Sequence, residues 1–326
     1  MLTAAYIFEE RFEGLRPGDE HRLTHLNVAF ALVKDGKASV AHWKNPELIR
    51  KLIERKGSMK VVLSVGGWGA GGFSTAVSTA AGRDIFADSL VKIVDNYGFD
   101  GVDMDWEYPG SGVADIDFSP DDKVNYTEFI KVLRDKLPSK LITMAAGAFQ
   151  EAINNLEIPK LVELMDFINL MTYDLLDFER VSHHTALHPS SQSSSISAAE
   201  AVELYHNAGV PHNKLVLGAA FYGRVYNNVA GLDKVADGSV PGFLAGGYAA
   251  VMEQAERAGG ISFDQEAQAP YIYNAEERTF ITFDNPLSLA AKCAYILELG
   301  LLGIMFWEYN SDDERGSLLK AIEEAS

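Results

Sequence analysis

Residues Phe99 to Pro109 read FDGVDMDWEYP, in which four acids alternate with residues that favour β-strands. Side chains of a strand alternate between its two faces, so Asp103, Asp105 and Glu107 share one face. Two residues along a strand span roughly 6 to 7 Å, so each carboxylate influences the next. Burying like charges together forces at least one to hold a proton near neutral pH, which suits an acid catalyst. The opposite face carries three apolar residues, Val102, Met104 and Trp106.

A solvated sheet edge or a cation site would also explain a row of acids. Trp106, Tyr108 and Pro109 stand directly beside Glu107, and such large residues are unusual at a solvated edge. A calcium loop would need Gly, Asn and carbonyl ligands in a twelve-residue frame, which this stretch lacks. The spacing therefore favours a buried acidic face.

Length, composition and charge limit the class of protein. The chain has 326 residues, 47% of them apolar, which is enough for one large barrel domain with an insertion. Its net charge of −18 and its lack of clustered Lys and Arg argue against nucleic acid as a partner. A neutral glycan is compatible with this charge, and we expect a monomer.

Several features bear on the compartment and on cofactors. The single cysteine, Cys293, cannot form an internal disulfide and lies in an apolar helical pattern, which predicts a packed thiol. No run approaches the ~18 apolar residues of a membrane span. Met1 to Phe8 lacks the features of a signal peptide, so the chain is cytoplasmic as written or secreted if a leader was trimmed. The sequence predicts no metal ion and no cofactor.

Strand-like and helix-like segments alternate along the chain, which is typical of a parallel α/β fold. Eight strands and five intervening helices predict an α/β protein with a (β/α)8 TIM barrel. The predicted strands are Leu2–Phe8, Leu26–Val33, Lys60–Val65, Phe99–Glu107, Leu141–Gly147, Phe167–Tyr173, Lys214–Tyr222 and Leu302–Trp307. The predicted helices are Pro46–Arg55, Gly82–Tyr97, Asn125–Lys136, Ala198–Gly209 and Leu287–Leu299.

The connection after the seventh strand, Val225 to Asn285, is far longer than the two to six residues usual between such elements. Tyr271–Tyr273 and Thr279–Phe283 flank a polar turn and predict a hairpin. Glycine-rich and helical stretches, Gly242–Gly247 and Tyr248–Ala258, precede it. We therefore expect a barrel of residues 1–224 and 286–326 with a small α+β insertion of residues 225–285.

The string DGVDMDWEYP resembles the catalytic signature of glycoside hydrolase family 18, the chitinases and related endo-N-acetylglucosaminidases. Two further strand ends support the resemblance. Ser64-Val65-Gly66-Gly67 resembles the family's S-x-G-G motif, and Met171-Thr172-Tyr173-Asp174 matches its M-T-Y-D motif. The long insertion resembles the one that many chitinases carry as a wall of the cleft.

The resemblance implies a retaining mechanism in which the substrate's own 2-acetamido group is the nucleophile and an oxazolinium ion is the intermediate, an exception to the usual pair of protein carboxylates. Glu107 would protonate the glycosidic oxygen. Asp105 would hold the acetamido N–H and share a proton with Asp103, and Tyr173 would bind the acetamido group. The implied substrate is chitin or chitooligosaccharide.

Other strand ends supply candidate substrate-binding residues, since barrel sites collect there. Ser64 is expected to hydrogen-bond the acid row, although it could only cap its turn. Tyr173 could instead be a core residue and Arg224 a surface ion pair. Trp307 offers a flat face for a sugar ring, with core packing as its alternative. The resemblance implies that Asp174, Tyr222 and Arg224 bind the sugar chain. Tyr6 and Phe30 fit the same ring of aromatics as Trp307, and Met171 and Trp68, from the two motifs, complete the candidates.

The segment His183 to Ser197 is rich in serine and predicts a flexible surface loop. Its histidines, His183, His184 and His188, invite a metal interpretation that we reject, because no carboxylate or cysteine completes a defined site nearby in the sequence.

Two rival functions remain open. An endo-β-N-acetylglucosaminidase acting on N-glycan cores would share the motifs, and a chitin-binding lectin would share the barrel without the cutting. Lectins of this kind usually replace the glutamate, which is present here as Glu107.

Overall fold

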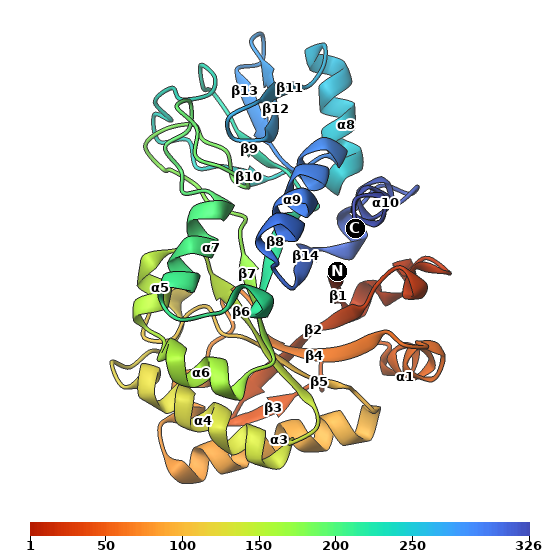
Figure 1. Cartoon of the computed structure of the whole chain (residues 1–326), viewed down its shortest axis with the longest axis vertical. Helices are drawn as coiled ribbons and strands as arrows, with labels where there is room; N and C mark the ends of the chain where they lie inside the picture. The colour runs from red at the N-terminus through yellow and green to blue at the C-terminus, as the bar shows by residue number, and fades with distance from the viewer.

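The computed structural model describes residues 1–326 and contains a closed barrel of eight parallel strands (Figure 1). Neighbouring strands pair in the order β1, β14, β8, β7, β6, β5, β4 and β2, and β2 pairs with β1 to close the ring. The short strand β3 (Lys37–Ser39) adds antiparallel to β2. The barrel strands are β1 (Leu2–Phe8), β2 (His25–Lys34), β4 (Lys60–Gly66), β5 (Gly101–Asp105), β6 (Leu141–Gly147), β7 (Phe167–Met171), β8 (Leu215–Ala220) and β14 (Gly303–Trp307).

The predicted (β/α)8 fold is thus confirmed. Helices lie between the strands along the chain, as Figure 1 shows for α3, α4 and α6. The α-helices outside the insertion are α1 (Pro46–Arg55), α2 (Phe73–Val77), α3 (Ala80–Tyr97), α4 (Asp122–Lys136), α5 (Gln150–Asn154), α6 (Ile158–Leu164), α7 (Ala198–Asn207), α9 (Pro286–Leu299) and α10 (Ser317–Glu324). Short 3₁₀ turns are Glu9–Gly14, Asp19–His21, Val113–Asp115, His212–Lys214 and Tyr309–Ser311. No helix is both long enough and apolar enough to cross a membrane.

Local signals fix the ends of the longer helices. Helix α7 begins with a reciprocal capping box between Ser197 and Glu200, which satisfies backbone N–H groups that the first turn leaves free. Helix α3 begins at the cap residue Thr79 and ends at Gly98, whose positive φ of 82° only glycine adopts at little cost.

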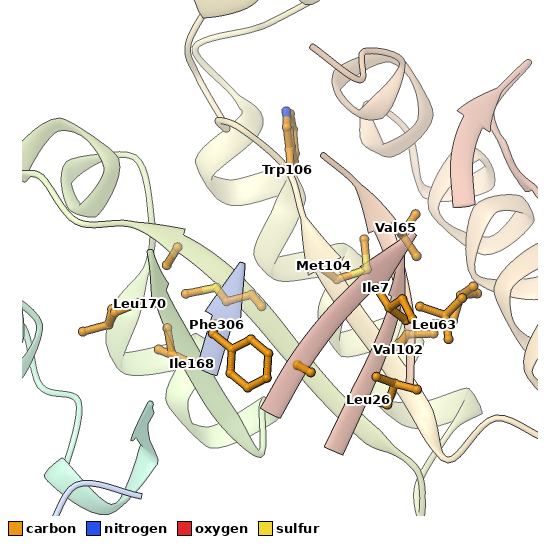
Figure 2. Close-up of a cluster of buried hydrophobic side chains, with 14 of the residues drawn as sticks. Ile7, Leu26, Leu63, Val65, Val102, Met104, Trp106, Ile168, Leu170 and Phe306 are labelled. Atoms are coloured by element: carbon orange, nitrogen blue, oxygen red, sulfur yellow. The ribbon is translucent and has the colours of Figure 1, made fainter. Parts of the chain in front are cut away.

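Strand alternation separates two cores. Outward-facing side chains pack under the helices in one continuous cluster of 69 buried residues, which therefore supplies most of the burial. Figure 2 shows part of it, where Val102 and Met104 of β5 lie beside Leu63 and Val65 of β4. The barrel interior holds a separate cluster of seven, Ala4, Tyr6, Ala145, Phe167, Met171, Val216 and Met305.

The predicted strand at Phe99–Glu107 is too long at both ends. The parallel ladder between β4 and β5 stops at the pair Gly66 and Asp105. Trp106 then packs outward, stacked on Phe73 at 5.2 Å between ring centroids. Glu107 therefore follows the strand and lies in the connection above it.

The connection between β8 and α9 folds as a second, antiparallel sheet with one helix, seen at the top of Figure 1. Its strands pair in the order β10, β9, β13, β12 and β11. The expected hairpin is present as β12 and β13, with Asn274 opposite Thr279. The elements are β9 (Arg224–Tyr226), β10 (Gly242–Phe243), α8 (Gly247–Ala258), β11 (Ser262–Asp264), β12 (Ala269–Asn274) and β13 (Thr279–Thr282).

A buried ion pair joins this sheet to the barrel. Lys292 of α9 and Asp284 are both fully buried and lie 2.6 Å apart. Asp284 also accepts a hydrogen bond from the backbone N–H of Ala220, at the end of β8. Separating Lys292 from Asp284 would leave an unpaired buried charge, which is strongly destabilising. The pair therefore favours the observed contact between the inserted sheet and the barrel.

Candidate active site

The carboxyl ends of the barrel strands surround a cleft of about 1120 Å³. Its floor comes from the barrel and one of its walls from residues of the inserted sheet. The predicted residues that line it are Tyr6, Phe30, Trp68, Asp105, Glu107, Met171, Tyr173, Asp174, Tyr222, Arg224 and Trp307. Ser64 and Asp103 lie deeper, on the barrel interior, and are fully buried.

Asp103 is held by four hydrogen-bond donors. Its Oδ1 accepts from Thr143 Oγ1 at 2.6 Å and from Asn169 Nδ2 at 3.1 Å. Its Oδ2 accepts from Tyr6 Oη at 2.8 Å and from the expected donor, Ser64 Oγ, at 2.9 Å. Burial raises the pKa of Asp103, and these four bonds oppose that shift. Both oxygens of Asp103 already accept hydrogen bonds from the protein, so this carboxylate is held in place beneath the cleft.

Asp105 is almost as buried as Asp103 but lacks comparable support. It is 4% exposed, and its Oδ1 has no hydrogen-bond partner. Burial, then the charges of Glu107 and Asp103, raise the pKa of Asp105 well above its ordinary value. No hydrogen bond joins Asp105 to Asp103, whose two oxygens each accept two bonds from other residues, so the sharing of a proton between these acids stays a prediction. Asp105 therefore combines a strongly raised pKa with a carboxyl oxygen that has no hydrogen-bond partner in the protein.

Glu107 lies beyond the strand end, at the wall of the cleft. Burial raises the pKa of Glu107 to about 7, and the negative charge of Asp174 adds to that shift, while a hydrogen bond with Tyr108 opposes it. A carboxylic acid with a pKa near 7 can both donate and accept a proton at neutral pH, as general acid–base catalysis requires. The peptide bond between Glu107 and Tyr108 is cis.

Tyr173 presents its phenol to the cleft beside Met171. Within the protein its hydroxyl donates only to the thioether sulfur of Met305, a weak acceptor at 3.8 Å. Burial raises the pKa of Tyr173 well above its ordinary value, so the hydroxyl keeps its proton. It can therefore donate a stronger hydrogen bond to a bound ligand.

Asp174 and Arg224 form an ion pair on the cleft wall. Arg224 donates through Nε and Nη2 to the two carboxylate oxygens, both at 2.6 Å. Burial raises the pKa of Asp174, but hydrogen bonds from His184 and Arg224 outweigh it and hold the pKa well below its usual range. Arg224 was expected either to bind substrate or to form an ion pair. It forms the ion pair with Asp174 and also lines the cleft.

Trp307 is braced by other aromatic rings. It stacks on Phe30 at 5.7 Å with an interplanar angle of 15°. Phe8 meets it edge-on at 5.2 Å, and Tyr6 lies 5.8 Å away. The indole lines the cleft from this fixed position, as a platform for a sugar ring would. It also packs against neighbouring rings, which was the alternative expectation for this residue. Tyr6, by contrast, is 1% exposed and serves mainly as a donor to Asp103.

Trp68 stands apart from these rings. It is 65% exposed and lies between Gly67 and Gly69, both with positive φ. Asp117 holds the end of this loop by accepting from the backbone N–H of Gly72, and it also accepts from the N–H of Thr75 in α2 at 3.0 Å. The indole therefore rises from an anchored loop into the cleft.

Several apolar residues of the cleft wall were missed by sequence reasoning. They include three exposed side chains from loops or the inserted sheet, Phe178, Val240 and Phe243. Phe243 lies under the Arg224 guanidinium, 3.6 Å from the ring centroid, a close cation–π contact. No periodicity marks these residues in the sequence. Phe8 could have been found, because it follows Tyr6 at the spacing that places both on one strand face.

The prediction of a surface loop at His183–Ser197 is wrong for its first part. Residues 182–187 are fully or almost fully buried, because they pack between the barrel end and the inserted sheet. His183 Nε2 lies 3.2 Å from Asp264 and His184 Nδ1 lies 3.4 Å from Asp174. No three ligating side chains come together as a metal site.

The chain was compared with known proteins. Residues 3–312 match the family model for glycosyl hydrolases family 18. Chitinase A1 from Niallia circulans is 35% identical over 305 residues, which cover 82% of this chain and 43% of that protein. Chitinase B from Serratia marcescens is 28% identical, with 95% of this chain and 77% of that protein covered.

Solved structures give the same result. A glycoside hydrolase family 18 N-acetylglucosaminidase from Paenibacillus barengoltzii superposes with a TM-score of 0.94 at 36% identity, covering 100% of this chain and 99% of that one. The chain spans 43% of the length of Chitinase A1 and 63% of Chitinase 1 from Aphanocladium album. By family model, sequence identity and barrel structure, the chain belongs to glycosyl hydrolases family 18.

Proposed function

We propose that this chain is a chitinase, which hydrolyses β-1,4 bonds between N-acetylglucosamine units of chitin or chitooligosaccharides with retention at the anomeric carbon. The observation that carries the proposal is Glu107, an acid with a pKa of about 7 on the wall of the cleft. Relatives named chitinases, at 35% and 28% identity, support the choice of substrate.

In the first step Glu107 gives its proton to the glycosidic oxygen as the bond from that oxygen to the anomeric carbon breaks. The carbonyl oxygen of the substrate's 2-acetamido group attacks the anomeric carbon from the other side, which yields an oxazolinium ion. Water then attacks that carbon as its bond to the acetamido oxygen breaks, which restores the acetamido group, and the Glu107 carboxylate takes up a proton from the water. Two inversions give net retention, and the protein ends in its starting state.

Asp105 and Tyr173 orient the acetamido group in this proposal. The unpartnered Oδ1 of Asp105 is a free acceptor for the acetamido N–H. The Tyr173 hydroxyl is a donor for the acetamido carbonyl oxygen, since its only protein partner is a sulfur. The raised pKa of Asp105 disfavours its carboxylate form, which favours attack by the substrate's own acetamido group.

The aromatic residues of the cleft would bind the sugar rings. Trp307 is the central platform, and the exposed Trp68 and Phe243 extend the apolar surface in the cleft. Residues 225–285 would act as a distinct α+β unit that deepens the cleft, and we expect the protein to act as a monomer without a cofactor.

Product stereochemistry and substrate choice test this function. We expect β-anomer first by proton NMR on chitotetraose, inhibition by N-acetylglucosamine thiazoline, and no hydrolysis of cellotetraose, which lacks the acetamido group. An α-anomer first, or equal rates on both tetramers, would contradict substrate assistance.

An endo-N-acetylglucosaminidase is the second candidate, because the similar structure from Paenibacillus barengoltzii is called an N-acetylglucosaminidase. Faster cleavage of a high-mannose glycopeptide than of chitotetraose would favour this second function. Binding of chitotetraose without hydrolysis would instead indicate the lectin.

A further inference from the structure

The loop that carries Trp68 into the cleft consists mostly of glycine. Five of the seven residues from Gly66 to Gly72 are glycines, and four of these have a positive φ, between 78° and 119°. Glycine loses more conformational freedom on ordering than any other residue. Since the Trp68 indole is 65% exposed and contacts the protein little, contacts at the ends of the loop must hold it in place.

Two acids supply these contacts. The backbone N–H of Gly67 donates to the carbonyl oxygen of Asp105 at 2.9 Å, which ties the start of the loop to β5. The N–H of Gly72 donates to Asp117 Oδ1 at the other end. Asp117 Oδ2 accepts from the backbone N–H and the hydroxyl of Thr75, at 3.0 and 2.9 Å. Burial raises the pKa of Asp117, but the bonds from Gly72 and Thr75 outweigh it and lower the pKa, so the carboxylate is charged at neutral pH.

Asp117 belongs to a different segment of the cleft rim, which follows the row of acids and lines the cleft with Val113. The preceding residue, Ile116, is 7% exposed and packs in the main core. The two rim segments touch directly, because a Cβ atom at Gly71 would lie only 3.1 Å from Asp117 Oδ1. The carboxylate therefore stands on a packed residue and closes the glycine-rich loop from outside.

We propose that Asp117 is a positioning residue for sugar binding: its carboxylate orders the loop of residues 66–72 and so holds the Trp68 indole in the cleft. Without this anchor a bound sugar ring would itself have to order the glycines, which would weaken binding. The inference rests on the proposed function, because it concerns how one wall of that same cleft is prepared for its substrate.

The first test compares Asp117→Ala, Trp68→Ala and the double variant on chitotetraose. We expect KM to rise about fivefold in Trp68→Ala and about threefold in Asp117→Ala, with kcat of Asp117→Ala changed less than about twofold, since the loss lies away from the reacting atoms. The double variant should raise KM by no more than about sixfold, because Asp117 acts through Trp68. An unchanged KM in Asp117→Ala, or a rise of about fifteenfold in the double variant, overturns the proposal.

Asp313 is the matched control. It also accepts from two backbone N–H groups, those of Arg315 and Ser317, both at 3.0 Å, and from the Ser317 hydroxyl at 2.6 Å, but it does not line the cleft. Asp313→Ala should lower Tm about as much as Asp117→Ala while leaving KM unchanged. If both variants raise KM alike, the effect is general destabilisation and the proposal is wrong.

A second measurement does not depend on turnover. Heteronuclear NOE values of the Gly69 and Gly71 amides and of the Trp68 indole N–H should be high in the wild type and in Asp313→Ala, and should fall in Asp117→Ala. Unchanged values in Asp117→Ala overturn the proposal. If the wild type does not hydrolyse chitotetraose while these values do fall, only the proposed function is contradicted, and the same comparison of variants is then made on Kd by calorimetry.

Discussion

Asp103 and Asp105 lie two residues apart on one face of β5, and both are buried, yet their surroundings are opposite. Four side chains donate to Asp103, so both of its oxygens are occupied. Asp105 has an oxygen with no partner and faces the charges of its two acidic neighbours. The row of acids therefore has a supported inner end and an open outer end.

This difference shows that donors, more than burial, separate a structural acid from a reactive one. A buried carboxylate with several donors can keep its charge, whereas one without them holds a proton. Along this row the change occurs over the two residues from Asp103 to Asp105, at the level where the barrel interior gives way to the cleft.

The largest expected effect comes from Glu107→Gln at the open end. The amide keeps the shape of the side chain but has no proton to transfer, so turnover on chitotetraose should fall by roughly 10³-fold or more. Kd for the same oligosaccharide should stay within about threefold of wild type. Hydrolysis within tenfold of the wild-type rate would show that Glu107 is not the acid.

Asparagine at each aspartate tests the comparison directly. Asp105→Asn should lower kcat by about 10²-fold or more and leave Tm unchanged or higher, since it removes a poorly supported acid. Asp103→Asn should destabilise the fold by about 2 to 4 kcal/mol, because its amide N–H would face existing donors. Thermal unfolding and kinetics of both variants check this. Equal losses of Tm would remove the distinction between the two acids.

The pH dependence tests the state of Glu107. The acid must be protonated to act, so kcat should fall as pH rises through about 7. Asp174→Asn removes a charge that raises the pKa of Glu107, so in this variant the fall of kcat should occur at lower pH. If kcat falls at the same pH in the variant and in the wild type, the charge of Asp174 does not raise the pKa of Glu107.

The same shift has a consequence for stability. The ordinary pKa of the Glu107 carboxyl is 4.5, so the unfolded chain loses this proton at lower pH than the folded protein. The contribution of Glu107 to stability therefore falls as pH rises from about 4.5 to about 7, on the order of 3 kcal/mol at most. Unfolding of Glu107→Gln should lack this component. An identical pH dependence in both proteins would contradict the raised pKa.

Much of the barrel could be predicted from the sequence because parallel strands carry continuous apolar runs. The predicted β1 and β6 have the observed bounds. Errors occur where pairing, which a single segment cannot reveal, ends a strand early, as at Trp106. The short helices α5 and α6 were missed, since each has too few residues to show a helical period.

The site was predictable where one strand carries its own chemistry, as Asp103, Asp105 and Glu107 do. The contacts that assign their roles come from distant parts of the chain. Thr143 of β6 and Asn169 of β7 donate to Asp103 of β5 inside the barrel. His184, in a buried loop, lies beside Asp174. Such contacts depend on tertiary packing, and no local pattern in the sequence marks them.

Two tryptophans of the cleft differ in the same way as the two aspartates. Trp307 packs against other rings of the protein, whereas Trp68 is mostly exposed. Trp307→Ala should weaken chitotetraose binding by about 1 to 3 kcal/mol, from loss of a large apolar surface against a sugar ring. Tm should also fall, because Phe30 and Phe8 lose their packing partner. Unchanged KM with a lower Tm would assign this indole to the core alone.

Trp68 is the open counterpart and gives the smallest expected effect. Its indole is 65% exposed and contacts the protein little, so Trp68→Ala should leave the free energy of unfolding within about 0.5 kcal/mol. Binding should weaken by about 1 kcal/mol, roughly fivefold in KM, if a sugar ring packs on the exposed face. Phe118→Ala is the matched control, since Phe118 is 58% exposed and does not line the cleft, so its KM should not change. Equal KM for both variants and wild type would show that no sugar binds at Trp68. A loss of Tm in Trp68→Ala would show instead that this indole, like Trp307, is supported by the fold.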